Sequence, residues 1–152
     1  MKKYLLLAYF IAVSSLVAVP ISPKATGENY AYYEFVATVN TTGQNPASWY
    51  PLLEVKDIVS GGYKTIEVFA TIAEFPPSEN IKDKGAMYAY IGHNMGGTSV
   101  FYKDGSVALR SGVGDFSVVD APVIGTSLGV SIYGVSLPPG AVKIKVSAYL
   151  IK

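Results

Sequence analysis

The sequence contains no cysteine and a single histidine, His93. The lack of cysteine excludes disulfide bonds, thiolate metal sites and a cysteine nucleophile, and a lone histidine excludes a multi-histidine metal site. Charged residues are also scarce, at 15% of the chain, and the formal net charge of +1 gives no indication of a nucleic-acid partner. Composition therefore argues against several classes of enzyme and against nucleic-acid binding.

Hydrophobic residues, tyrosine and glycine are what the chain has in abundance. Half of its 152 residues are hydrophobic, and it contains 12 tyrosines and 15 glycines. Tyrosine is enriched in β-strands, whereas glycine disfavours helix interiors and is common in turns. The length suits one domain of ordinary size.

The N-terminal segment differs from the rest of the chain. Lys2 and Lys3 precede a stretch from Tyr4 to Ile21 that is apolar except for two serines and a proline, which is the pattern of a secretory signal peptide. Alternatively, Tyr4–Ser22 is retained as a helix of about 28 Å, marginally long enough to cross a bilayer.

Both interpretations export the remainder of the chain, and the cleavage point is poorly defined. We therefore assign residues 1–25 to a signal peptide or membrane anchor and residues 26–152 to one exported domain, secreted or held at the cell surface. A membrane partner is expected only if residues 4–22 are retained.

After residue 25, apolar side chains recur at every second position, which is typical of β-strands. In Asn29–Asn40, for example, Tyr33, Phe35 and Val39 share one strongly apolar face. The pattern predicts eight or nine short strands and no helix after residue 25. Besides the first, the expected strands are Tyr50–Val59, Tyr63–Phe75, Ala86–His93, Thr98–Lys103, Ser106–Arg110, Phe116–Val119, Ser127–Tyr133 and Ala141–Ile151.

Turn residues separate these strands. Asp104-Gly105, between two alternating runs, favours a type I′ hairpin, because both central residues of that turn need positive φ. The regular spacing of short strands predicts an all-β fold, an antiparallel β-sandwich of the jelly-roll or Ig-like kind.

Groups that could carry out catalysis are dispersed along the sequence. Glu54 and Asp57 fall on opposite faces of one expected strand, and so do Glu67 and Glu74 of the next. His93 is placed in a turn at a strand end, where a structural role is more common than a catalytic one. We therefore expect no catalytic residue, no cofactor and no metal site, and we predict that the protein is not an enzyme.

Two further features bear on the surface of the domain. Asn40-Thr41-Thr42 is an N-glycosylation sequon at the end of the first strand, so Asn40 is a candidate acceptor. The tyrosines either pack across strands in the ordinary way or form an exposed face that contacts carbohydrate or another subunit.

The first strand is the strongest functional clue. It is apolar on one face, partly apolar on the other, and begins beside the processing region. Such a strand either belongs to its own sandwich or completes the sheet of a neighbouring subunit. The residues expected to form the subunit interface as this donor strand are Tyr30, Ala31, Tyr32, Tyr33, Phe35, Val36, Ala37 and Val39.

The chain resembles exported filament subunits that polymerise by donor-strand complementation, namely the archaeal bundling pili and the related bacterial biofilm-matrix fibres. The shared features are a leader beginning Lys2-Lys3, a β-domain rich in Tyr, Gly and Val, the lack of Cys, and the N-terminal strand Asn29–Val39. The resemblance implies an extracellular structural fibre in which each strand inserts into a groove of the next subunit.

The expected function is therefore that of a structural subunit of an extracellular filament or pilus, a homopolymer whose partners are copies of itself. Two alternatives remain at this stage. A retained Tyr4–Ser22 helix predicts a membrane-anchored or virion structural protein, and exposed tyrosines with Trp49 predict an exported carbohydrate-binding module.

Overall fold

The computed structural model describes residues 19–41, 47–74, 86–109, 113–122, 124–135 and 140–152. Within these ranges it contains nine strands and one short helix, α1 (Val55–Gly61). The strands are β1 (Ala25–Thr26), β2 (Tyr30–Thr41), β3 (Ala47–Glu54), β4 (Thr65–Glu74), β5 (Ala86–Met95), β6 (Thr98–Leu109), β7 (Asp115–Asp120), β8 (Ser127–Val135) and β9 (Gly140–Ile151).

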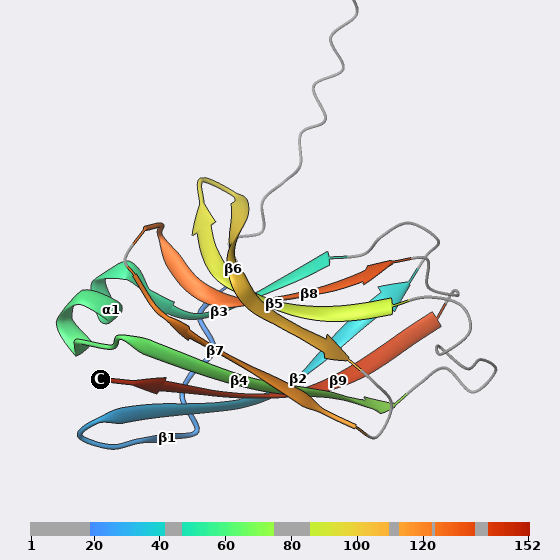
Figure 1. Ribbon diagram of the computed structural model, residues 1–152, viewed down its shortest axis with the longest axis horizontal. Helices are drawn as coiled ribbons and strands as arrows, with labels where there is room; N and C mark the ends of the chain where they lie inside the picture. Colours follow the sequence, from blue (N-terminus) through green and yellow to red (C-terminus); the bar gives the residue numbers. More distant parts are fainter. Residues whose placement is uncertain (1–18, 42–46, 75–85, 110–112, 123, 136–139) are drawn as a thin grey trace, which may run out of the picture.

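The strands form two antiparallel sheets that pack face to face, as Figure 1 shows. The larger sheet has the order β1-β2-β9-β4-β7 and the smaller sheet the order β3-β8-β5-β6. Apart from β1, the strands pair as β2 with β9, β3 with β8, β4 with β7 and β5 with β6, as if one long hairpin were folded into two layers. This is the jelly-roll arrangement, so the predicted sandwich is confirmed.

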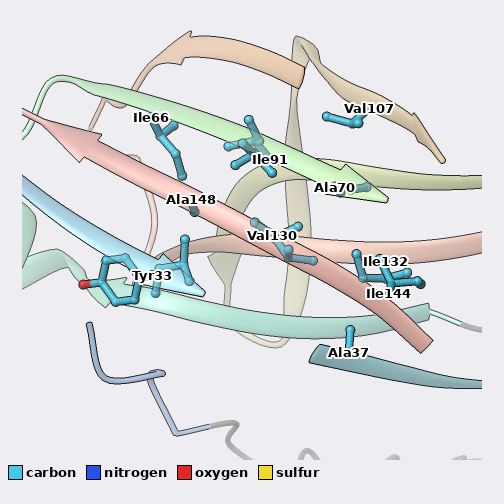
Figure 2. Packing of buried hydrophobic residues seen from close by; sticks show 14 of the residues in the cluster. Tyr33, Ala37, Ile66, Ala70, Ile91, Val107, Val130, Ile132, Ile144 and Ala148 are labelled. Carbon is cyan, nitrogen blue, oxygen red and sulfur yellow. The ribbon is translucent and has the colours of Figure 1, made fainter. Parts of the chain in front are cut away.

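The core lies between the sheets and follows the two-residue period of the sequence. Figure 2 shows side chains from both sheets meeting there, including Ile144 of β9, Ile91 of β5 and Val130 of β8. Along β9 the even-numbered residues are buried and the odd-numbered ones are mostly exposed, from Val142 to Leu150. Burying one face of each sheet in this way removes apolar area from water, which is the main stabilising contribution to the fold.

The second predicted strand is wrong in its second half. Residues Tyr50–Glu54 do lie in β3, but Val55–Gly61 form helix α1, which ends at Gly62 in a left-handed conformation with φ of 66°. The Gly62 N–H donates to the carbonyl of Ile58, and the side chain of Ile58 is buried in the core. Packing of this one side chain lets a short helix form despite two β-branched valines.

The predicted Asp104-Gly105 hairpin is also wrong, because β6 continues through both residues. The β5–β6 connection is made instead at Gly96 and Gly97, whose φ angles are 61° and 91°. Two consecutive positive φ angles are what a type I′ turn requires, and the Asn94 side chain closes this turn by accepting a hydrogen bond from the Gly97 N–H.

Asp104-Gly105 instead forms a bulge in β6. Tyr90 pairs with Ser106 and Gly92 with Phe101, so Ile91 alone faces four residues of β6. The bulge bends β6 toward β7, where the Ser117 hydroxyl donates to the Asp104 carbonyl at 2.7 Å. A tertiary contact thus determines the backbone geometry of Asp104-Gly105, although this dipeptide by itself favours a turn.

The predicted signal or anchor, residues 1–25, lies mainly outside the described residues, which begin at Val19. Within the part of the chain that the structure describes, no helix is long and apolar enough to span a membrane.

The hairpin assignment is testable at Gly96. No atom lies within 4 Å of a Cβ built there, so a substitution affects only the backbone conformation. We expect Gly96→Ala to lower the free energy of unfolding by roughly 1–2 kcal/mol, because an L-residue resists positive φ. Gly96→Asn should lose less, since Asn tolerates this conformation. Urea denaturation measures both, and equal stability of Gly96→Ala and the parent protein would contradict the turn.

Candidate functional site: strand β2 and its free edge

Strand β2 lies near one side of the larger sheet, with β9 as its inner neighbour. The two strands pair without a register shift from Tyr30 opposite Ile151 to Thr41 opposite Gly140. This ladder includes the whole predicted donor strand. In the single chain, β2 is therefore a strand of its own sandwich, and exchange would require the same ladder to form between two chains.

The inward face of β2 fills the core. Phe35 is half-buried, and its ring packs against the ring of Tyr50 from β3, with centroids 5.2 Å apart. The remaining inward side chains are at most 2% exposed: Ala31, Tyr33, Ala37 and Val39. The alternation predicted from the sequence is confirmed, and these side chains attach β2 to both sheets.

The outward face of β2 is partly apolar. Val36 is 59% exposed, and Tyr30 is also exposed. The ring of Tyr32 stacks on that of Tyr149 from β9, with centroids 4.5 Å apart. This face gives β2 an accessible apolar surface in addition to its backbone.

Among the described residues, the outer edge of β2 is covered at its beginning. β1 pairs with Ala31 and Tyr32, and the carbonyl of Tyr32 accepts a hydrogen bond from the Lys24 N–H at 2.7 Å. Even-numbered residues of β2 thus point their backbone groups away from β9. Beyond Tyr32, no strand in the described part of the chain pairs with this edge, which leaves the N–H and C=O groups of Glu34, Val36, Thr38 and Asn40 facing outward.

The other sheet edges carry features that hinder pairing with another chain. The edge strand β3 contains Pro51 and an adjacent register shift, β6 contains the bulge at Asp104-Gly105, and β7 has only 6 residues. Natural sheets protect their edges with such prolines, bulges and short strands. Between Tyr33 and Thr41, by contrast, β2 has no proline, lysine or register shift.

Residues 20–26, here called the strap, run beside this edge and cross to the other sheet. The Ile21 N–H donates to the carbonyl of Pro51 in β3. The Lys24 ammonium contacts the carboxylate of Glu34, which also accepts a hydrogen bond from the Tyr32 hydroxyl at 2.8 Å. These two hydrogen bonds, Lys24 first, lower the pKa of Glu34 to about 2.

A groove of about 410 Å³ lies between the strap, β2, β3 and α1. Its lining includes Tyr33, Leu52, Asp57 and Tyr63. Burial, with smaller contributions from Tyr63 and Asp57, raises the pKa of Tyr33 to about 12, so this phenol stays protonated at neutral pH. The groove thus has a lining of mixed polarity beside the start of β2.

The predicted acceptor Asn40 is exposed near the end of β2, on the outward face of the larger sheet. Thr42 of the sequon lies outside the described residues. Attachment of a glycan at Asn40 stays a prediction.

The acidic residues do not gather into a metal site: within the described ranges, no group of three or more His, Asp or Glu side chains could hold an ion. The predicted opposite parity of Glu67 and Glu74 is wrong, because a register shift between Ile72 and Glu74 places both carboxylates on the outward face of β4. Asp57 lies in α1 rather than in a strand, so the predicted parity of Glu54 and Asp57 does not apply.

His93 lies inside β5 rather than in a turn, and it is 0% exposed. Its ring packs edge-on against Tyr102, with centroids 5.7 Å apart, and neither ring nitrogen has a hydrogen-bond partner among the described residues. Burial lowers the pKa of His93, although the nearby backbone of Pro122 and Ser127 acts in the opposite direction. His93 is thus a neutral core residue.

Sequence reasoning found the residues of β2 but missed the free edge and the strap, because strand order is not encoded in any local pattern. It also did not bring together Trp49, Tyr88, Tyr90 and Tyr133, which share the outer face of the smaller sheet. These residues occupy even positions on β5 and odd positions on β3 and β8. That pattern indicates a shared face only when the pairing of the three strands is known.

No protein-family model matches the sequence, and no curated protein matches it. Among solved structures, the chain is similar to a crystal structure of tripeptidyl peptidase 2, with a TM-score of 0.45 and 10% identity. The match covers 86% of this chain and 10% of the peptidase chain, and at this level it carries no argument about function.

The position of His93 makes stability depend on pH. The unfolded chain binds a proton at His93 near pH 6.5, whereas the folded chain binds it only at lower pH. The free energy of unfolding should therefore fall as the pH is lowered from 7.5 to 5.5. His93→Leu should remove this slope, because leucine has no titratable group and keeps an apolar side chain in the core.

Chemical denaturation of both proteins at several pH values in this range measures the effect. Carboxylates titrate mainly below this range, so they add little to the difference between the two proteins. Equal slopes for the parent and His93→Leu would show that His93 is protonated as readily in the folded chain as in the unfolded one.

Proposed function

We propose that the protein is the structural subunit of an extracellular filament, in which strand β2 joins neighbouring copies by donor-strand exchange. The observation that carries the proposal is the state of the sheet edges. Of the strands that present an outer edge in the described part of the chain, β2 alone combines a length of 12 residues with a stretch beyond Tyr32 that has no proline, lysine or bulge.

The topology favours exchange at this strand. β2 has only the two-residue β1 outside it, so its departure leaves the order β9-β4-β7 unbroken. It would expose the edge of β9 and an apolar slot between the sheets. The slot accepts an alternating strand, because the side chains of Ala31, Tyr33, Ala37 and Val39 fill it in the single chain.

An exchanged strand reproduces the contacts of the single chain. The β2 of one copy would pair with the β9 of the next in the same register and bury the same side chains. Each copy then donates one strand and accepts another, which is a head-to-tail contact. Repetition of such a contact produces a filament when the rotation does not close into a ring.

The extracellular location rests on the N-terminal sequence, in which Lys2 and Lys3 precede an apolar stretch. The strap lies next to the donor strand, so processing and strand exchange would involve adjacent segments. No catalytic group is needed for this function, since backbone hydrogen bonds and apolar burial supply the affinity.

Disulfide trapping tests the exchange, because the natural chain has no cysteine. Thr38 and Lys143 are exposed partners in the β2–β9 ladder, in a pair whose Cα atoms should be about 4.5 Å apart. That separation suits a disulfide. Chains carrying only Thr38→Cys should therefore cross-link to chains carrying only Lys143→Cys when the two are assembled together and oxidised.

A non-reducing gel of differently tagged chains measures the cross-link, and negative-stain electron microscopy records the fibres. Ser147→Cys is the matched control, because Ser147 is opposite Glu34, four residues out of register with Thr38. Fibres without the Thr38–Lys143 cross-link would refute exchange through β2. The absence of fibres from extracellular material would refute the filament itself.

A further inference from the structure

The outer face of the smaller sheet carries a group of aromatic side chains that the proposed filament does not use. Phe101 is 42% exposed, and the other rings are half-buried against one another. We call this group the platform; its members are Trp49 of β3, Tyr133 of β8, Tyr88 and Tyr90 of β5, and Phe101 of β6.

Tyr90 lies at the centre of the platform. Its ring centroid is 5.2 Å from that of Phe101, 5.9 Å from that of Tyr88 and 6.4 Å from that of Tyr133. Trp49 is placed on the same face by the register, because Trp49 and Tyr90 both pair with Ser131 of β8. The rings thus extend across all four strands.

Two glycines let the outer rings lie close to the sheet. Gly92 and Gly129 pair with each other near the middle of this face. A Cβ at Gly129 would lie 2.9 Å from Cζ2 of Trp49, and a Cβ at Gly92 would lie 3.0 Å from Cδ1 of Phe101. The indole and the phenyl ring therefore occupy the space above the glycine backbone and lie low over the sheet.

The platform is uncharged. Its three cross-strand rows contain only aromatic residues, serine, glycine, alanine and proline, with Ser106 exposed beside Tyr90. The outer face of the larger sheet differs, since it carries the ion pairs Lys143–Glu74 and Lys145–Glu34. A partner for the platform consequently needs apolar faces and hydroxyl groups but no charge.

We propose that the platform binds a neutral polysaccharide chain. The C–H faces of pyranose rings are apolar and pack on aromatic rings, while their hydroxyls suit the tyrosine and serine hydroxyls at the same surface. Sulfated or uronic-acid polymers find no cation in the three rows. A second copy of this protein is a poorer match, because the platform lacks the arginine and methionine that are enriched in protein interfaces alongside aromatic residues.

The only tryptophan of the chain reports on binding directly. We would titrate the folded protein with soluble β-1,3-glucan, mannan and hydroxyethylcellulose, with alginate as the acidic comparison, and follow Trp49 fluorescence. At least one neutral polymer should give a saturable change, and 1 M NaCl should leave it unaltered. Tyr90→Ala should weaken binding at least tenfold, whereas Tyr90→Phe should stay within about threefold of the parent protein.

Phe116→Ala is the matched control, because Phe116 is 67% exposed and lies on the outer face of the larger sheet. This substitution should leave polysaccharide binding unchanged. Cooperative unfolding of each variant shows that it folds. If Tyr90→Ala does not fold, the response of the folded Tyr90→Phe variant to the polymers still tests the proposal.

Three results would overturn the proposal: no fluorescence response to any neutral polymer, binding of alginate alone, or equal binding by the parent protein and a folded Tyr90→Ala variant. A change in sedimentation on Tyr90→Ala without any polysaccharide response would assign the face to contacts between copies instead. The test does not depend on whether filaments form.

Discussion

The pairing of β9 with β2 on one side and β4 on the other holds the larger sheet together. β9 is the last strand of the chain, and its even-numbered side chains form a continuous apolar row in the core. Tyr30 pairs with Ile151, 121 positions further along the sequence. The larger sheet therefore cannot be completed until β9 is available as well as β2. Pairing at such sequence separation is slow, because the entropy of closing a long loop is lost before the contacts form.

This constraint creates a competition between chains. Until β9 has paired with its own β2, the β2 of another chain offers the same backbone groups and side chains in the same register. The intramolecular ladder is favoured because its two strands belong to one chain, and the intermolecular one is favoured by high protein concentration. The unprotected edge of β2 also differs from the edges of β3 and β7, which Pro51 and short strand length protect. The proposed filament would form through the edge of β2, whereas the other sheet edges carry features that hinder pairing with another chain.

The sequence predicted the layers of this fold better than their details. Alternation located most strands and their buried faces, because burial on one side of a sheet imposes a two-residue period. The turn predicted at Asp104-Gly105 is wrong because the contact of Ser117 with the Asp104 carbonyl bends β6. This contact depends on the strand order. Helix α1 was missed because Val55–Gly61 has little intrinsic helix preference and is held by the burial of Ile58. The free edge of β2 and the platform likewise follow from strand order, which local patterns do not specify.

The two proposed surfaces occupy different parts of the sandwich and are compatible with each other. The proposed subunit contact through β2 lies along one side of the sandwich. The platform covers the outer face of the smaller sheet, with Trp49 on the strand β3 at the margin of that sheet. In a filament joined through β2, each copy would display one platform, so the platforms would repeat along the fibre. A single platform of a few rings gives weak binding, but an array that contacts one long polysaccharide gains affinity through effective concentration. Assembly would then set the strength of polysaccharide binding without changing any contact within the platform.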